Sequence, residues 1–318
     1  MRIGVLNNLR AGRSGTQVSR ILELLRSHPD VLHVETDHAH VLPEALAELT
    51  HEELDLLVVN GGDGTLQFAL TEMLSDPDLP RVPMVAPLRG GRTNMTALDM
   101  RAQRDPVKGL SRLLHAIDTG RLEEHLAPRS VVRIASNRRE KVEYGMFFGA
   151  GIIHRAISVV HRVFPTGRSQ GVFGAGIVTA ALIGKMFSRP TDGIMTPDKV
   201  GVLLDDGSSY GGEFYLLIAS TLDRLFLRMN PYWGSGPGGV RFTSLASNAQ
   251  RIAAAVPGIL RGRPAPHVTP ENGYTSVNSD NVDLHFDCGF TIDGEIFDPQ
   301  PDERVTLGAD RRVTFVRA

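Results

Sequence analysis

Along the first 120 residues, short apolar runs alternate with segments in which apolar residues recur every three or four positions. The runs predict strands, and the run at 54–59 is apolar enough for a strand covered on both faces. The periodic segments predict amphipathic helices, such as the stripe from Leu110 to Ile117 that stops at Gly120. The alternation predicts a doubly wound parallel sheet with helices on both faces. Its predicted strands are 3–6, 31–35, 54–59 and 83–87.

Beyond residue 120 the pattern changes to many short strands separated by Gly, Asp, Asn or Pro, which favours an antiparallel, sandwich-like domain. Apolar helical stretches interrupt them near 152–163, 171–187 and 247–260. We therefore expect an α/β domain over residues 1–120 and a β-rich domain over 121–318, with the last strands free to return to the first domain. The predicted strands are 131–134, 146–149, 200–204, 214–218, 240–242, 274–277, 282–286, 290–292, 304–307 and 313–316.

Composition narrows the class of protein. The chain has 318 residues, enough for roughly two domains, and 42% of them are hydrophobic. The net charge of −2 gives no reason to expect a nucleic-acid partner. The single cysteine, Cys288, cannot form an intrachain disulfide, which favours the cytoplasm. The longest apolar run, 171–184, is shorter than the roughly 20 residues that span a bilayer. A peripheral contact with the inner face of the membrane stays open.

The strand at 54–59 is followed by Asn60-Gly61-Gly62-Asp63-Gly64-Thr65 and then by a predicted helix. The glycines let the backbone turn tightly and approach a ligand closely, and N–H groups at the start of a helix attract phosphate. Asp63 is a candidate for orienting a metal-bound water or a ribose hydroxyl, and Thr65 for donating to a phosphate oxygen. The alternative is a plain tight turn, although a hairpin does not fit between a buried strand and a helix.

A second glycine-rich loop, Arg89-Gly90-Gly91-Arg92-Thr93-Asn94, follows the strand at 83–87. Loops at the carboxyl ends of parallel strands converge on one crevice, so the two loops could hold one polyphosphate. The arginines add positive charge, and Thr93 and Asn94 add side-chain donors. The alternative is that Thr93 or Asn94 only caps a helix.

A third candidate is Thr291-Ile292-Asp293-Gly294-Glu295. Two carboxylates two positions apart at a strand end can face one side of a sheet. A carboxylate there could accept a proton from an attacking hydroxyl or bind a metal ion. Taken alone, the sequence favours the simpler interpretation of a hairpin turn.

Together the three loops resemble the diacylglycerol kinase catalytic family, which includes bacterial lipid kinases and the sphingosine and ceramide kinases. Residues 61–65 match the family's Gly-Gly-Asp-Gly-Thr loop, 91–94 resemble its Gly-Thr-x-Asn loop, and 293–295 match its late Asp-Gly-Glu. Residues 8–12 are similar to its Asn-Pro-x-x-Gly element. The chain departs from these motifs at Leu9, Arg92 and Met95, where the family commonly has proline, threonine and aspartate.

The resemblance implies an ATP- and Mg²⁺-dependent lipid kinase that transfers the γ-phosphate to the hydroxyl of a diacylglycerol-like acceptor. Asp293 would be the general base, Glu295 would assist it or bind metal, and Asp63 is the other candidate metal ligand. The nucleotide would contact Asn8, Gly12, Gly61, Gly62, Asp63, Gly64, Thr65, Gly91, Arg92, Thr93 and Asn94.

Two other functions stay open. A NAD kinase shares the Gly-Gly-Asp-Gly loop and a similar two-domain layout. A non-catalytic lipid- or nucleotide-binding protein on the same scaffold would suit Arg92 and Met95. The expected partners are a lipid with a free hydroxyl and a membrane surface, and a homodimer is left open.

Overall fold

The computed structural model describes residues 1–9, 15–36, 41–50, 53–163 and 195–318. Gly12 and the apolar run at 171–184 therefore lie outside the described residues. The chain forms two compact units, one made of residues 1–129 with 312–318 and the other of residues 130–311. We call them unit 1 and unit 2.

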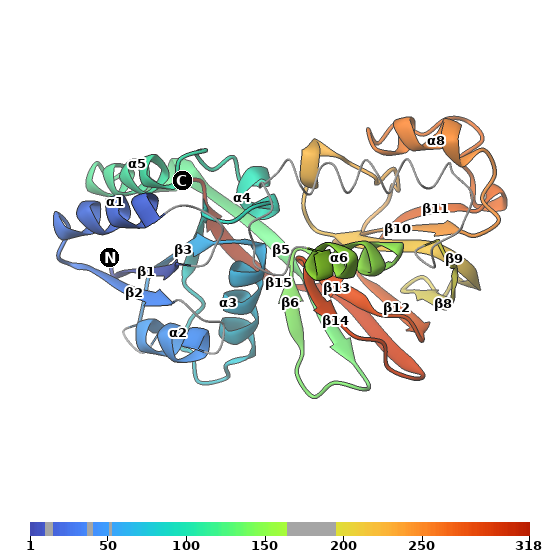
Figure 1. The fold of residues 1–318 in the computed structure, drawn as a ribbon, viewed down its shortest axis with the longest axis horizontal. Coiled ribbons are helices and arrows are strands. Elements are labelled where there is room, and N and C mark those ends of the chain that lie inside the picture. Colours follow the sequence, from blue (N-terminus) through green and yellow to red (C-terminus); the bar gives the residue numbers. More distant parts are fainter. Residues whose placement is uncertain (10–14, 37–40, 51–52, 164–194) are drawn as a thin grey trace. The chain divides into compact units, whose positions relative to one another are not determined.

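Unit 1 is built on a parallel sheet with the strand order β2-β1-β3-β4. The end of β15 continues this sheet, because Phe315 pairs in parallel with Val85 of β4. In Figure 1, α1 and α5 lie on one face of this sheet and α2 and α3 on the other. The strands are β1 (Ile3–Asn8), β2 (Val31–Thr36), β3 (Leu56–Gly61), β4 (Met84–Arg89) and β15 (Glu303–Val316). The helices are α1 (Gly15–Arg26), α2 (Leu42–Thr50), α3 (Asp63–Ser75), α4 (Met95–Asp99) and α5 (Pro106–Asp118).

The central strand β3 shows why the sheet is covered on both faces. Leu56 and Val58 pack into a core with side chains of α1 and α5. Leu57 and Val59 point to the opposite face because side chains alternate along a strand, and they too are fully or almost fully buried. The predicted doubly wound sheet is confirmed.

The boundary between the units falls later than the sequence predicts, after Arg129 rather than after residue 120. Leu122 and Leu126 pack against the apolar core of unit 1 and keep the short 3-10 helix η2 (Leu122–His125) with that unit. The chain end also returns to unit 1, where the backbone N–H of Gln103 donates to the carbonyl of Ala318 over 2.8 Å.

Unit 2 consists mainly of antiparallel strands in the order β14-β13-β7-β9-β8-β12-β15. The long strand β9 pairs through its first half with β8 and through its second half with β7 and β10, and β10 also pairs with β11. The strands are β5 (Leu126–Ser136), β6 (Glu143–Gly145), β7 (Phe147–Gly151), β8 (Asp198–Leu204), β9 (Ser209–Ser220), β10 (Val240–Ala246), β11 (Tyr274–Ser279), β12 (Asn281–Phe286), β13 (Phe290–Ile292) and β14 (Glu295–Phe297).

Alternation of side chains explains this sheet. In β12, Val282, Leu284 and Phe286 are buried and the residues between them are exposed, as expected for a strand with one face on a core. Side chains from β5, β7, β8, β9, β10, β13 and β15 join the same core. The predicted β-rich, sandwich-like class is confirmed. The sequence missed the short strands β6 and β14, and it divided the continuous strand β15 in two.

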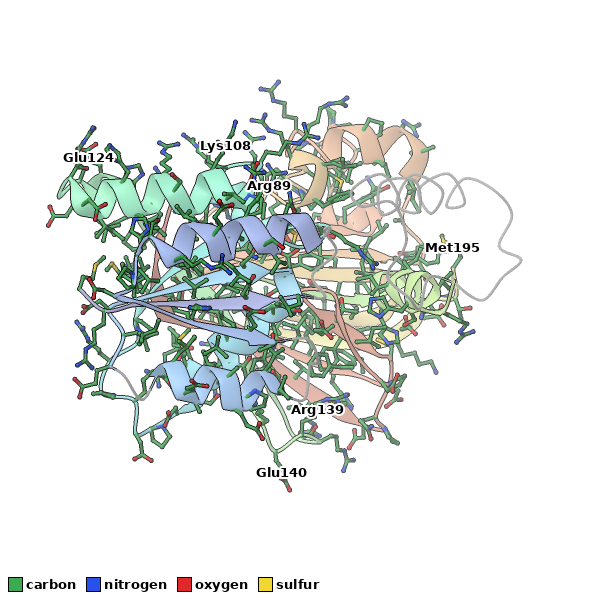
Figure 2. The ribbon with its side chains drawn as sticks, turned by 60° about the vertical axis from the view of Figure 1, so that its left-hand side comes forward. Arg89, Lys108, Glu124, Arg139, Glu140 and Met195 are labelled. Atoms are coloured by element: carbon green, nitrogen blue, oxygen red, sulfur yellow. The ribbon has the colours of Figure 1, made fainter. Side chains whose placement is uncertain are left out.

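Two α-helices and two 3-10 turns lie between the strands in the described part of unit 2. The expected helix at 152–163 is α6 (Ile152–Val163), and the one near 247–260 is the shorter α8 (Ile252–Ile259). Further 3-10 turns are η3 (Phe226–Arg228) and η4 (Pro270–Asn272). Arg139 lies in the turn between β5 and β6 (Figure 2). Within the described residues, no helix is both long and apolar enough to cross a membrane.

Candidate functional site

The two glycine-rich segments of unit 1 follow neighbouring parallel strands. Gly61 of β3 pairs in register with Arg89 of β4, so the chain leaves both strands at the same edge of the sheet. Gly61 is the last residue of its strand, Gly62 caps α3, and Asp63 begins the helix. Asp63, Gly64 and Thr65 thus form the first turn of α3, where the backbone N–H groups have no partner within the helix.

Gly62 and Gly91 bring these two segments into direct backbone contact. A Cβ atom added to Gly91 would lie 2.3 Å from the Cα of Gly62, a distance that no real side chain could keep. Gly90 is equally confined, because its added Cβ would lie 2.9 Å from the backbone nitrogen of Gly61. Glycine is therefore required at 90 and 91 to let the two turns close against each other.

The carboxylate of Asp63 ties the two segments together. Its Oδ2 accepts a hydrogen bond from the backbone N–H of Met95 at 3.0 Å, and its Oδ1 accepts one from Thr96 at 3.1 Å. These are N–H groups of the first turn of α4, so Asp63, at the start of α3, acts as a cap for a second helix. Burial raises the pKa of Asp63, and the two N–H donors act in the opposite direction.

Asn94 closes the second loop on itself. The backbone N–H of Gly91 donates to Oδ1 of Asn94, and Nδ2 of Asn94 donates back to the carbonyl of Gly91, both at 2.7 Å. Asn94 is buried and takes a positive φ of 50°, a conformation that Asn adopts more readily than most residues. Arg92 and Thr93, between these two residues, are half-buried. Asn94 therefore shapes the loop that presents Arg92 and Thr93.

A set of asparagines lies beside these loops at the ends of β1 and β3. Nδ2 of Asn8 donates to Oγ1 of Thr65 at 2.8 Å, and Nδ2 of Asn60 donates to Oδ1 of Asn7 at 2.6 Å. Asn7 and Asn60 are buried, and among the described residues Nδ2 of Asn7 and Oδ1 of Asn60 have no hydrogen-bond partner. A buried amide atom without a hydrogen-bond partner lowers the stability of the fold. We therefore expect water or a polar ligand to bind these two atoms.

The sequence singled out Asn8 but not the pair Asn7 and Asn60. The available signal was that two neighbouring buried strands carry asparagine near their ends, β1 in Asn7-Asn8 and β3 in Asn60-Gly61. That signal needed the parallel pairing of β1 with β3, which places Asn7 opposite Asn60.

In unit 2, Asp293 and Gly294 form the two-residue turn between β13 and β14. Ile292 pairs with Glu295, and both turn residues have positive φ values, 50° and 95°. The hairpin that the sequence favours for this segment is therefore present.

The hairpin does not exclude a chemical role, because Asp293 turns its carboxylate inward. The residue is 8% exposed, and Oδ2 accepts the backbone N–H of Met146 at 2.8 Å. Gly145 allows this approach, since a Cβ there would lie 2.8 Å from Oδ2. The carboxylate is held in one orientation by β6 and β7, elements far from it in the sequence.

Glu295 differs from Asp293 in its environment. It is exposed on β14, whereas Asp293 is buried in the turn, so the expected common side for the two carboxylates is not found. The left-handed conformation of the two turn residues breaks the alternation on which that expectation depended.

The described residues contain no group of three or more His, Cys, Asp or Glu side chains that could hold a metal ion by itself. Mg²⁺ usually needs only one or two carboxylates besides phosphates and water. Asp63 already accepts two N–H groups, while Glu295 is open to solvent. Of the two candidate ligands, Glu295 is the more accessible.

Comparison with known families agrees with this geometry. Residues 2–122 match the diacylglycerol kinase catalytic domain. The resemblance stated from the motifs is thereby confirmed over most of unit 1. No curated protein matches the chain.

Solved structures extend the likeness over the whole chain. A diacylglycerol kinase from Bacillus anthracis strain Sterne is similar with a TM-score of 0.65 and 15% identity, covering 100% of this chain and 97% of that one. The yeast NADH kinase complexed with NADH is similar with a TM-score of 0.51 and 11% identity, covering 100% of this chain and 84% of that one. At these identities the likeness concerns the fold alone.

Proposed function

We propose that this protein is an ATP- and Mg²⁺-dependent lipid kinase that phosphorylates the hydroxyl of a diacylglycerol-like acceptor. The observation that carries the proposal is the contact between Gly62 and Gly91, locked by the two hydrogen bonds to Asp63. The family of residues 2–122 supports a kinase-like phosphotransferase.

The first turn of α3 suits a nucleotide's phosphates. Gly62 precedes it without a side-chain cap, so the N–H groups of Asp63, Gly64 and Thr65 are not covered by a capping residue. Such N–H groups and the positive end of the helix dipole favour an anion. The unpartnered amide atoms of Asn7 and Asn60 lie at the ends of the adjoining strands and would gain partners from a bound nucleotide or its water.

Within the proposal, ATP supplies the phosphoryl group, and Mg²⁺ neutralises charge on its phosphates. Asp293 would accept the proton of the lipid hydroxyl as that oxygen attacks the phosphorus, and it would be held in place for this by Met146 and Gly145. Glu295 would assist or bind the metal. Arg92, a half-buried residue of the second loop, would add positive charge near the phosphates.

The setting of the reaction follows from the acceptor. A diacylglycerol-like lipid lies in a bilayer, so the enzyme would work as a peripheral protein on the inner face of the cytoplasmic membrane. The apolar run at 171–184 lies outside the described residues, so this membrane contact has no assigned segment there. A homodimer stays a prediction.

Phosphorylation of NAD is the second candidate, and one observation favours it. The fold is also similar to that of the yeast NADH kinase. A non-catalytic binding protein is the third, because Arg92 and Met95 replace residues that the family commonly has at these positions.

The deciding experiment is a radiolabelled-ATP assay with diacylglycerol vesicles, total lipid extract and NAD in parallel, with products identified by mass spectrometry. We expect label in a lipid product and its loss when EDTA removes Mg²⁺. Label in NADP would favour the NAD kinase. ATP binding in calorimetry without turnover on any acceptor would favour the non-catalytic protein.

A further inference from the structure

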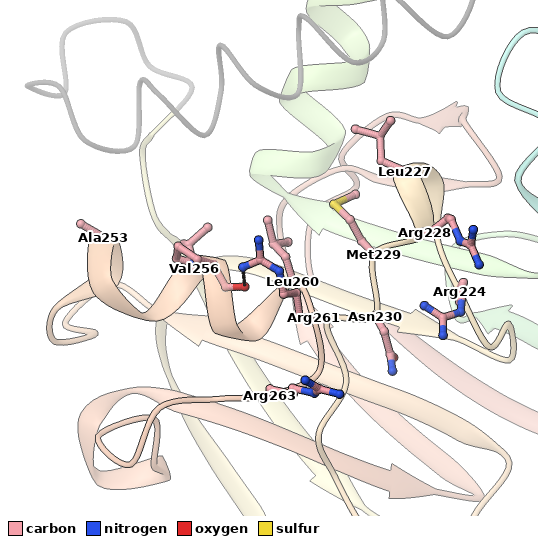
Figure 3. A pocket seen from close by; sticks show the side chains of 11 residues that line it. Arg224, Leu227, Arg228, Met229, Asn230, Ala253, Val256, Leu260, Arg261 and Arg263 are labelled. Carbon is pink, nitrogen blue, oxygen red and sulfur yellow. Dashed lines mark hydrogen bonds between the residues drawn. The ribbon is translucent and has the colours of Figure 1, made fainter.

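Unit 2 contains a cavity of about 670 Å³ that is remote in sequence from the motifs described above. It lies between the segment 224–230, which includes η3, and the segment 253–263, which includes α8 (Figure 3). Four arginines line it, Arg224, Arg228, Arg261 and Arg263, and no acidic residue does. A chain with a net charge of −2 thus concentrates positive charge at this one cavity.

Three of these arginines are available to a ligand. Within the described residues, Arg228 and Arg263 form no ion pair, and Arg261 donates to the backbone carbonyl of Pro257 at 2.9 Å. All three are exposed. Guanidinium groups present paired N–H donors that match the oxygens of a phosphate, so several of them around one cavity favour a phosphate ligand.

Apart from the arginines and Asn230, the lining is apolar. Leu227 and Met229 stand on the η3 side, and Val256 and Leu260 stand on the α8 side (Figure 3). Leu227 is 57% exposed, an unusual state for a large apolar side chain beside a cavity. A ligand with a phosphate head and an apolar tail would bind both the arginines and the apolar side chains of this cavity.

The backbone at Leu227 is strained, and this supports a role outside folding. Leu227 and Arg228 have φ values of 55° and 60°, the left-handed region that residues with a Cβ atom avoid. The turn is closed by the N–H of Leu225, which donates to the carbonyl of Met229 at 2.7 Å. The fold therefore tolerates two unfavourable conformations in a turn that holds a leucine out in solvent and an arginine beside it, a pattern found at binding sites.

We infer that this cavity binds the phosphate headgroup of an anionic phospholipid and docks unit 2 on an anionic bilayer. Arg228, Arg261 and Arg263 would contact the phosphate, while Leu227 and Met229 would enter the acyl layer. The exposed Leu227 favours a bilayer over a soluble phosphate ester as the ligand. A bilayer would bury this side chain, whereas a soluble ester would leave it in water. The inference goes beyond the proposed function, because it concerns binding by unit 2 and requires no nucleotide.

The test is co-sedimentation of the full chain with vesicles of phosphatidylcholine, with and without 30 mol% phosphatidylglycerol. We expect binding only to the anionic vesicles and a loss of at least tenfold in affinity in the R228E/R263E variant. The matched control is K199E/R311E, which changes the net charge equally at two exposed positions elsewhere on unit 2. It should bind within about twofold of the unmodified protein. Equal loss in both variants would contradict the site.

A second variant separates docking from simple charge attraction. Leu227→Asn keeps every charge and places at φ 55° a residue that accepts this conformation. It should unfold at the same or a higher temperature and yet bind anionic vesicles several-fold more weakly. Unchanged vesicle binding would overturn the role of Leu227.

Inorganic phosphate and a soluble acceptor complete the design. If calorimetry shows that inorganic phosphate binds and R228E/R263E removes it, while anionic vesicles do not bind, the ligand is soluble and docking is wrong. Turnover of a short-chain, water-soluble diacylglycerol should be the same in all variants. Absence of that turnover in the unmodified protein would contradict the proposed kinase and leave the vesicle result to stand by itself.

Discussion

The carboxylate of Asp63 accepts the backbone N–H of Met95 over 3.0 Å and so joins two glycine-rich segments that are about thirty residues apart in the chain. Each of its oxygens receives one N–H from the first turn of α4. Asp63 therefore determines how the second loop is placed relative to the first, a role that comes before any contact with a ligand.

Replacing Asp63 by asparagine should lower both stability and nucleotide affinity. An amide offers one acceptor oxygen where the carboxylate offers two, so one N–H of α4 would face an NH₂ group. We expect a loss of about 2 kcal/mol in the free energy of unfolding, the scale of a hydrogen bond to a charged group. Urea denaturation measures this loss. Asp118→Asn, at an exposed position near the end of α5, is the control and should change it by less than about 0.5 kcal/mol.

The raised pKa of Asp63 predicts an unusual pH dependence. Burial raises this pKa above its ordinary value of 3.8, so the folded protein holds the proton to a higher pH than the unfolded chain does. The stability that comes from this bound proton is therefore full below pH 3.8 and is lost as the pH rises through the raised pKa, whereas the hydrogen bonds from Met95 and Thr96 stabilise the fold on both sides of that pKa. The difference in unfolding free energy between the unmodified protein and Asp63→Asn, measured from pH 3.5 to 7, should follow this direction. A difference that grows with pH would contradict it.

Two glycine substitutions should separate folding from ligand binding. Gly91→Ala places a methyl group 2.3 Å from the Cα of Gly62, so one backbone must move, and we expect a lower melting temperature and lost nucleotide binding. Gly62→Ala meets its nearest neighbour, the Cα of Gly91, at 3.6 Å, an ordinary contact. It should fold normally but weaken ATP binding at least tenfold in calorimetry, because its methyl group would occupy the space proposed for phosphate. Normal ATP binding in Gly62→Ala would place the phosphates elsewhere.

Asp293→Asn tests the proposed base without disturbing the turn. Asparagine can still accept the N–H of Met146, and Asn-Gly is the preferred pair for a two-residue turn with positive φ. The melting temperature should stay the same or rise, while phosphotransfer should fall by about 10²–10⁴, the range for loss of a general base. Full activity with normal stability would eliminate Asp293 as the base.

Arg139 should stabilise the hairpin that carries Asp293. Its Nε donates to the buried Glu303 at 2.8 Å, its Nη2 donates to the carbonyl of Asp298 at 2.8 Å, and its guanidinium lies 5.0 Å from the ring centre of Phe290. Arg139→Ala leaves the carboxylate of Glu303 buried without its cation, which should cost about 3 kcal/mol.

The double variant Arg139→Ala/Glu303→Gln should recover part of that loss, because it removes the buried charge as well. Chemical denaturation of the two single variants and the double variant measures the coupling. Additive losses would show that the ion pair adds nothing to the hairpin's stability.

The fold class could be predicted from the sequence because buried positions require apolar residues, and the spacing of these residues shows which faces of an element are buried. A strand covered on both faces, such as β3, is apolar along most of its length, and a strand with one face in solvent, such as β12, alternates. The short strands β6 and β14 were not predicted from the sequence because three residues are too few to show a period. In β14, Glu295 is also polar and exposed.

The sequence motifs identified the glycine-rich loops because the need for glycine arises from the local backbone. Tight turns and close backbone approach require glycine, and this requirement is met at Gly90, Gly91 and Gly294. What each polar side chain does is a different matter. Asp63 looks like a ligand in the sequence and serves as a cap for α4, and Asn94 bonds its own loop.

Sequence alone thus determined two kinds of domain, the glycine turns between strand and helix, and the position of a late Asp-Gly turn. Tertiary structure decided the partners: Met95 for Asp63, Asn7 for Asn60, and Met146 for Asp293. It also placed Arg228 beside Arg261 and Arg263 around one cavity. The reason is physical. Turn and strand preferences act between neighbours in the chain, whereas a hydrogen bond or a shared cavity depends on which distant segments packing brings within a few ångströms.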